Sequence, residues 1–136
     1  MKLLKSTASL GGEILGIDLN QELSQNQISF INKSWEKRFV LVFKNQTIDD
    51  NTLIRFSNNF GDLDPPGPNP YGITFLPEFP EINVISNVKN KSGTPIGNLG
   101  DGEAVWHADM TYQKVPPKAG ILYALEVPKD QGNTHF

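Results

Sequence analysis

His107 and Asp109, separated by one alanine in the stretch Trp106-His-Ala-Asp109, are the residues of this sequence best suited to metal chemistry. Side chains two positions apart on a β-strand point to the same face, so an imidazole nitrogen and a carboxylate oxygen can face one ion. Such a pair supplies two of the three ligands of the 2-His-1-carboxylate triad, which binds non-haem Fe(II) and leaves positions open for O2. The other histidine is His135. The sequence therefore predicts two metal ligands and leaves the third unassigned.

The N-terminal part of the chain predicts elements that can support this pair. Residues 10–19 mix β-forming residues with glycines, which indicates short strands around a turn. Ser24 and Gln27 have the spacing of a capping box. Apolar residues follow at helical spacing, which predicts a helix over residues 25–37.

A buried strand and a second helix are expected next. Residues 39–43 (Phe-Val-Leu-Val-Phe) are β-branched or aromatic without alternation, which predicts a strand buried on both faces. Acidic residues near 47–50 favour a helix N-terminus, and Gly61 is a natural residue to end that helix. The side chains expected to face inward from this helix are Leu53, Phe56 and Phe60.

The second half of the chain is typical of loops and strands. Residues 62–80 are rich in proline and glycine and cannot sustain a helix or a central strand. Strands are predicted at 81–88, 104–112 and 121–127, with a glycine-rich loop at 89–103. Because helices come early and strands late, the order of elements predicts an α+β fold with a mainly antiparallel sheet.

Length and composition narrow the class of protein. A chain of 136 residues fits one domain. A net charge of -3 gives no electrostatic reason to expect binding to nucleic acid or to an anionic membrane. The absence of cysteine suits a reducing compartment, so a cytoplasmic location is expected. The first residues lack an apolar run, and neither a signal peptide nor a transmembrane span is predicted.

Taken alone, the H-x-D spacing is weak support for a metal site. About one histidine in nine would have an acidic residue two positions later by chance, and the simplest alternative is a surface histidine beside a solvated aspartate. Context favours the metal site, because the pair follows a tryptophan and adjoins a glycine-rich loop, where functional residues concentrate. A zinc hydrolase is disfavoured, because such sites usually need three protein ligands and a placed general base.

A longer series of motifs surrounds the pair. Trp106-His-Ala-Asp-Met-Thr-Tyr112 is followed by Pro116-Pro117, by an apolar stretch ending at Ala124, and by Gly132-Asn-Thr134. In this order the motifs resemble the TauD/TfdA family of Fe(II)- and 2-oxoglutarate-dependent dioxygenases, which includes taurine dioxygenase. The glycines and apolar residues of 11–19, Asn45-Gln46 and Phe60-Gly61 also have counterparts in the family. The resemblance covers essentially the whole chain, but only about the first half of the family domain.

The resemblance implies both a fold and an activity. The fold would be a partial double-stranded β-helix, or jelly roll, with two N-terminal helices packed on the sheet. Residues 1–136 would form a single domain that is the N-terminal portion of the family domain, without its C-terminal strands. The activity would be that of an oxidoreductase: O2 is used to hydroxylate a small organic substrate, expected to be anionic, while 2-oxoglutarate becomes succinate and CO2.

The resemblance also implies roles for individual residues. His107 and Asp109 would bind Fe(II), and Thr134 would form a hydrogen bond with the distal carboxylate of the co-substrate 2-oxoglutarate. Gln131 stands where the family usually has a glycine, and Trp106 is expected to pack beneath the metal strand. His135 falls at no ligand position of the family. Loop residues expected to line the substrate are Asn69, Tyr71 and Glu103. No residue is assigned a direct catalytic step.

The second family histidine and the arginine that binds 2-oxoglutarate have no counterpart here, since Arg38 and Arg55 match neither position. Two ligands would hold iron weakly, and the co-substrate would lack its bidentate cation. The chain alone is therefore expected to be inactive. Three explanations stay open: a fragment of a normal enzyme, which is favoured; completion by a complementing C-terminal chain or within a homo-oligomer; and a non-catalytic remnant that acts as an interaction or metal-binding module.

Overall fold

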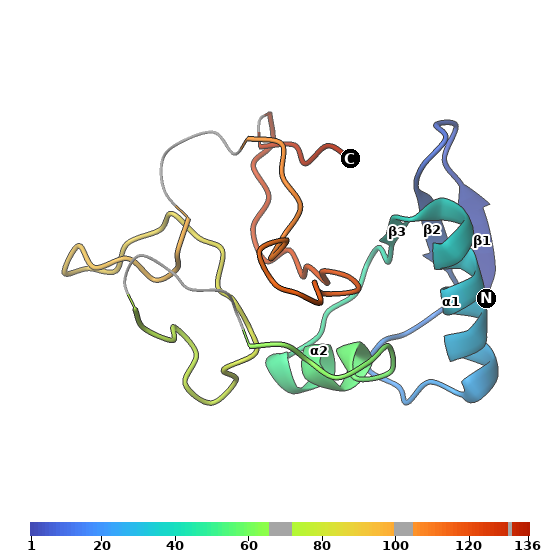
Figure 1. The fold of residues 1–136 in the computed structure, drawn as a ribbon, viewed down its shortest axis with the longest axis horizontal. Coiled ribbons are helices and arrows are strands. Elements are labelled where there is room, and N and C mark those ends of the chain that lie inside the picture. Colours follow the sequence, from blue (N-terminus) through green and yellow to red (C-terminus); the bar gives the residue numbers. More distant parts are fainter. Residues whose placement is uncertain (66–71, 100–104, 131) are drawn as a thin grey trace. The chain divides into compact units, whose positions relative to one another are not determined.

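The course of the chain is shown in Figure 1, which is drawn from a computed structural model. The structure describes residues 1–65, 72–99, 105–130 and 132–136. Two compact units are present. The N-terminal unit consists of Met1–Phe60 together with Tyr123–Phe136, and the central unit consists of Gly61–Leu122.

A three-stranded sheet with the order β1-β2-β3 lies in the N-terminal unit. Its strands are β1 (Lys2–Lys5), β2 (Gly12–Leu15) and β3 (Leu41–Val42). β1 pairs antiparallel with β2, from Lys2 opposite Leu15 to Lys5 opposite Gly12, and β2 pairs parallel with β3. The sequence predicted β2 but not β1. β1 exposes three of its four side chains, so it lacks the apolar alternation by which strands are recognised.

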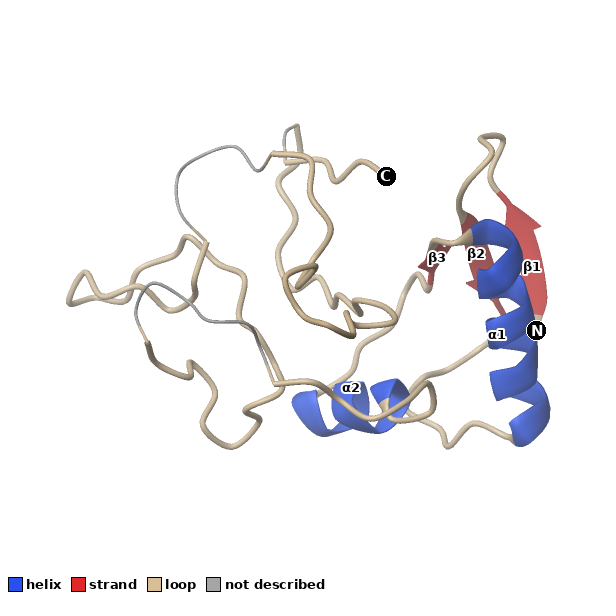
Figure 2. Cartoon of the chain, viewed as in Figure 1, coloured by secondary structure: helices blue, strands red, loops and turns tan. Residues whose placement is uncertain are grey.

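Helix α1 (Gln25–Arg38) confirms the helix predicted over 25–37. The Ser24 side chain accepts a hydrogen bond from the Gln27 backbone N–H, and the Gln27 side chain accepts one from the Ser24 N–H, which completes the capping box. The helix ends at Phe39, whose φ of 62° lies in the left-handed region. α1 contacts β2 and β3. Figure 2 shows the helix beside the sheet.

The strand predicted to be buried on both faces at 39–43 is wrong in its extent and in its burial. Only Leu41–Val42 forms a strand, and Phe39 and Val42 are 66% and 45% exposed. The physical reason is local. Phe39 is the C-cap of α1 and has a positive φ, which is incompatible with an extended strand. β3 also pairs with β2 alone, so it is an edge strand.

Helix α2 (Asp50–Ser57) begins where the sequence placed it. Asp49 is its N-cap and accepts a hydrogen bond of 2.8 Å from the Thr52 backbone N–H. The hydrogen bonds from Thr52 lower the pKa of Asp49. The helix stops at Ser57, before Gly61. The Asn59 side chain donates to the carbonyl oxygens of Arg55 and Phe56, and these hydrogen bonds cap the end of the helix.

A small apolar core joins the two helices and the sheet. Its buried residues are Leu19, Ile31 and Phe56. The ring of Phe56 meets Phe43 and Phe60 edge to face, with centroids 5.4 and 5.1 Å away. The partly buried residues around this cluster are Ile17, Leu23, Leu41, Phe43, Ile48 and Phe60. The core thus lies where α1, α2 and the residues flanking β3 converge.

The strands predicted at 81–88, 104–112 and 121–127 are absent from the described parts of those segments. Residues 84–99 instead form an irregular hairpin, called here the central hairpin. Its backbone hydrogen bonds run from Asn98 N to Val84 O (3.0 Å) and from Ile96 N to Val88 O (3.1 Å). The ladder is too interrupted to make strands. At Gly97 a Cβ would lie 2.7 Å from Val84 O, so the close approach of the two arms requires glycine there.

The sheet and the two helices agree with the predicted α+β class. The described residues form no jelly roll, because all strands found among them belong to the short sheet of the N-terminal unit. Within the same described residues, no helix is both long enough and apolar enough to cross a membrane.

Candidate functional site

The structure brings His107 and Asp109 together in the central unit. His107 Nε2 lies 3.2 Å from Asp109 Oδ1, and the two side chains are 58% and 78% exposed. The strand geometry used to predict this pairing is absent, since Met110 has a φ of 51° and Gln113 N donates to Met110 O in a turn. Proximity therefore comes from local contacts of the two side chains and not from a β-ladder.

The backbone carbonyl of Val105 orients the imidazole. It lies 2.7 Å from His107 Nδ1, which donates to it when that nitrogen carries the proton. This hydrogen bond, followed by the negative charge of Asp109, raises the pKa of His107. A carbonyl on one ring nitrogen fixes the tautomer and leaves the other nitrogen for a ligand, as is usual for metal-binding histidines. Nε2, the nitrogen that faces Asp109, is therefore the metal-binding candidate.

Two kinds of interaction fit the geometry of the pair. A nitrogen and an oxygen bound at neighbouring positions of a divalent metal are roughly 3 Å apart, because each bond is about 2.0–2.2 Å long. The observed separation of 3.2 Å fits such a pair of ligands. It also fits an ion pair between a protonated His107 and Asp109, which is the simple surface alternative. The donor set thus fits two positions of an iron site, and the exposure of both groups leaves an ion accessible to other ligands.

A third protein ligand is not found among the described residues, where no group of three histidine, cysteine, aspartate or glutamate side chains could hold a metal. His135 is exposed. The sequence prediction of two ligands without a third is therefore unchanged.

Both arginines hold backbone segments of the N-terminal unit. Arg38 donates to carbonyl oxygens in the β1–β2 loop, the shortest of these hydrogen bonds being 2.7 Å. Arg55 donates to the carbonyl oxygens of Leu19 and Asn20 at 3.0 and 2.8 Å. These contacts give each arginine a structural role, so neither is a good candidate for the cation that binds 2-oxoglutarate.

The G-x-T motif lies in the N-terminal unit, with Thr134 exposed. Gly132 has a φ of 76°, which glycine adopts readily, and a Cβ there would lie 3.3 Å from Pro128. The motif therefore needs its glycine for backbone reasons. Gln131, which replaces a family glycine, lies outside the described residues.

The expectation that Trp106 packs beneath the metal strand is wrong, because its side chain is 79% exposed. Without a strand at this position there is no sheet face for the indole to cover. The predicted substrate-lining residues Asn69, Tyr71 and Glu103 lie outside the described residues, so their role stays a prediction.

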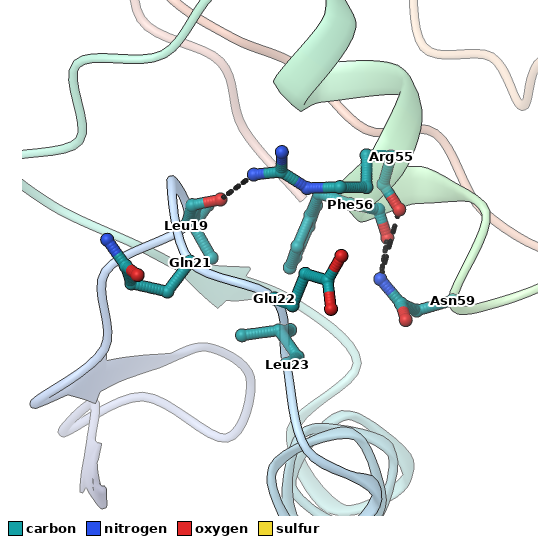
Figure 3. A pocket seen from close by; sticks show the side chains of 7 residues that line it. All are labelled: Leu19, Gln21, Glu22, Leu23, Arg55, Phe56 and Asn59. Atoms are coloured by element: carbon teal, nitrogen blue, oxygen red, sulfur yellow. Dashed lines mark hydrogen bonds between the residues drawn. The ribbon is translucent and has the colours of Figure 1, made fainter.

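A shallow pocket of about 190 Å³ lies in the N-terminal unit, where the loop before α1 faces α2 (Figure 3). It is lined by Leu19, Gln21, Glu22, Leu23, Arg55, Phe56 and Asn59. Its floor reaches the core through Phe56, and its polar groups include the Glu22 carboxylate. Sequence reasoning did not find this pocket, because its residues carry no motif and come together only through the packing of α2.

Several proteins of known activity are similar to this chain. The alpha-ketoglutarate-dependent 2,4-dichlorophenoxyacetate dioxygenase of Cupriavidus pinatubonensis is 25% identical over 127 residues, covering 88% of this chain and 44% of the relative. Pentalenolactone F synthase of Streptomyces avermitilis is 28% identical over 92% of this chain and 40% of its own length. An alkylsulfatase of Acinetobacter baylyi is 27% identical over 98% of this chain and 38% of its own length. This chain thus spans less than half the length of each of these relatives.

Among solved structures, the crystal structure of AAD-2 with Mn(II) and N-oxalylglycine is 26% identical. The match covers 47% of this chain and 25% of the other, with a TM-score of 0.46, which is too low to assign a fold. The decisive match is to a protein family. The taurine catabolism dioxygenase TauD, TfdA family is matched over residues 2–136. This chain belongs to the TauD/TfdA family.

Proposed function

We propose that this chain supplies two of the three iron ligands of an Fe(II)- and 2-oxoglutarate-dependent dioxygenase. The observation that carries the proposal is the His107–Asp109 pair, with Nε2 and Oδ1 3.2 Å apart and the other ring nitrogen held by the Val105 carbonyl. Membership of the TauD/TfdA family over residues 2–136 supports a metal site rather than a chance ion pair. When bound, Fe(II) with 2-oxoglutarate supplies the activation of O2 that hydroxylates a C–H bond.

The residues of this chain would bind the metal and the co-substrate and orient them. The Val105 carbonyl keeps the Nδ1 proton of His107 in place, so that Nε2 stays available beside Asp109. The carboxylate of Asp109 offsets part of the positive charge of the metal. Thr134 would donate its hydroxyl proton to the distal carboxylate of 2-oxoglutarate, from a motif whose backbone is shaped by Gly132.

The remaining parts of the site would come from the portion of the family domain that this chain does not match. That portion would provide the second histidine, the arginine that binds 2-oxoglutarate, and the strands that complete the jelly roll of the family domain. It could belong to a longer polypeptide, to a complementing chain or to a second copy. Because every one of these parts is needed, we expect the 136-residue chain alone to be inactive.

The substrate class is proposed from the names of the relatives. They include a 2,4-dichlorophenoxyacetate dioxygenase, an alkylsulfatase and a sulfate ester dioxygenase. Carboxylates and sulfate esters share a small organic body with an anionic group. We therefore propose a small organic anion as the substrate, consumed together with O2.

Anaerobic Fe(II) titration by calorimetry, with and without 2-oxoglutarate, tests the proposal. Fe(II) should bind weakly to the chain and more tightly when 2-oxoglutarate is present. His107→Ala and Asp109→Asn should each abolish this binding, whereas Asp62→Asn, which alters an exposed carboxylate elsewhere in the central unit, should leave it unchanged. Equal Fe(II) binding by the Asp109→Asn variant and the unaltered chain would contradict the assigned ligands. Formation of stoichiometric succinate by the chain alone would contradict the expectation that a third ligand must come from outside this chain.

An interaction or metal-binding module without oxidation chemistry is the second candidate. It is favoured by the exposure of large apolar side chains, including Leu125 at 84%, Trp106 at 79% and Val115 at 77%. Such side chains would mark a partner site if they formed a contiguous patch within one unit. The same titration separates the two candidates, because a module of this class would bind metal equally well with and without 2-oxoglutarate.

A further inference from the structure

The chain leaves the N-terminal unit after Phe60 and returns to it at Tyr123. The returning segment, residues 123–136, carries the G-x-T motif with Thr134. The attachment of this segment to the N-terminal unit therefore bears on the motif that Thr134 belongs to. Tyr123 is partly buried and forms tertiary hydrogen bonds within this unit.

The Tyr123 hydroxyl makes two hydrogen bonds to one loop. It accepts from the backbone N–H of Ile48 at 3.3 Å and donates to the backbone carbonyl of Gln46 at 3.5 Å. A phenol can donate and accept at the same time, and phenylalanine can do neither. The partners are 75 and 77 residues away in sequence, so these contacts are tertiary and fix the returning segment to the 44–48 loop.

The loop that receives the hydroxyl is itself held firmly. The Gln46 side chain accepts from the Leu19 N–H at 2.9 Å and donates to the carbonyl oxygens of Lys44 and Ile17 at 3.0 and 3.3 Å. Ile48 packs against the core cluster. The two backbone groups that meet Tyr123 therefore belong to a fixed part of the N-terminal unit.

Beyond Tyr123 the returning segment has little burial to hold it. Leu125, Val127 and Phe136 are 84%, 70% and 70% exposed. Apolar packing by these side chains contributes little to the attachment, because burial is what makes such packing favourable. The hydroxyl contacts thus carry a larger share of the attachment than they would in a well-buried strand.

We propose that Tyr123 is a positioning residue, whose hydroxyl anchors residues 123–136 to the 44–48 loop. The anchor sets the origin of the segment from which Thr134 extends. The consequence for 2-oxoglutarate rests on the proposed function, whereas the anchor itself does not.

Tyr123→Phe tests the anchor, because it removes the hydroxyl and keeps the ring. The Ile48 amide loses its acceptor, and its hydrogen exchange, followed by NMR, should accelerate by roughly three- to tenfold, as expected for the loss of one ordinary hydrogen bond. The Leu19 and Thr52 amides bond to other acceptors, Gln46 and Asp49, and serve as internal references. Tyr112→Phe is the matched control, since that side chain is 68% exposed in the central unit.

A distance measurement tests the positional consequence. The chain has no cysteine, so spin labels can be placed cleanly at Lys33→Cys on α1 and Lys129→Cys in the returning segment, both exposed positions. The distance distribution between the labels should broaden in Tyr123→Phe and stay unchanged in Tyr112→Phe, with the helix content from circular dichroism preserved in both.

An unchanged distribution together with unchanged Ile48 exchange in Tyr123→Phe would overturn the proposal. Neither measurement involves metal or 2-oxoglutarate. Failure of the anchor is therefore distinguishable from failure of the dioxygenase assignment.

Discussion

Replacing Phe56 with alanine removes the side chain at the centre of the core of the N-terminal unit. Phe56 is 5% exposed, and its ring meets Phe43 and Phe60 edge to face. Among the described residues, the cluster contains two other buried apolar side chains, Leu19 and Ile31. A core this small has few neighbours that can move in to fill the cavity.

The magnitude follows from the burial and from the ring contacts. Truncation of a buried phenylalanine to alanine costs about 3–5 kcal/mol of unfolding free energy. We expect the upper part of that range, because two edge-to-face contacts are lost with the ring. A domain is typically stable by about 5–15 kcal/mol, so Phe56→Ala should remove a large fraction of the stability. Phe56→Leu keeps most of the apolar volume and should cost about 1–2 kcal/mol.

Urea unfolding followed by the fluorescence of Trp35, which lies on α1, measures these differences. A Trp106→Phe background removes the other tryptophan signal. Phe39→Ala is the matched control, because Phe39 is 66% exposed and the same substitution there should change stability by less than about 0.5 kcal/mol. If Phe56→Ala and Phe39→Ala lower the urea midpoint equally, the core is not centred on Phe56 and the packing argument fails.

Three further predictions concern the central unit and α1. Gly97→Ala should open the central hairpin at a cost of about 1–3 kcal/mol, because a Cβ at this position would lie 2.7 Å from the Val84 carbonyl oxygen. Amide hydrogen exchange of the hairpin measures this opening. Gly120→Ala is the control and should be tolerated, because the atom nearest to a Cβ there is 4.0 Å away. The Val105 carbonyl and, to a smaller extent, Asp109 raise the pKa of His107. Protonated His107 therefore stabilises the folded chain at pH values below the ordinary pKa of histidine, and this contribution is lost as pH rises through the raised pKa. NMR titration of Asp109→Asn should show the pKa of His107 moving downward, and an unchanged pKa would mean that Asp109 does not act on the imidazole. Ser24→Ala removes the capping box of α1 and should cost about 1 kcal/mol in thermal unfolding; no loss would show that the cap is not formed in solution.

Local signals account for what could be predicted of the fold. The start of α1 follows from Ser24 and Gln27, and the start of α2 follows from the acidic residues at its N-terminus. These signals involve atoms within one helical turn, so they are visible in the sequence. The end of α2 was missed because Asn59 reaches back to two carbonyls, a contact that competes with the glycine rule.

The predicted late strands failed for a different reason. A strand is stabilised by a neighbour, and apolar residues alone do not provide one. Residues 84–99 show this, because their arms approach closely at Gly97 yet make only an interrupted set of hydrogen bonds. The exposure of Trp106 has the same origin, since its predicted burial required a sheet face that the described residues do not form.

The sequence by itself determined the family, the two helix starts and the choice of His107 and Asp109 as metal-ligand candidates, because these depend on residue type and short spacing. Only the tertiary structure decided that a carbonyl and a turn, rather than a strand, bring the candidate ligands to 3.2 Å. It also decided that Arg38 and Arg55 hold backbone carbonyls, and that Tyr123 meets the 44–48 loop. The contacts of His107 are local and depend on the backbone turn, whereas those of Arg38, Arg55 and Tyr123 join residues far apart in the chain. The long-range contacts depend on how the helices, the sheet and the loops pack, and sequence spacing carries no record of that packing.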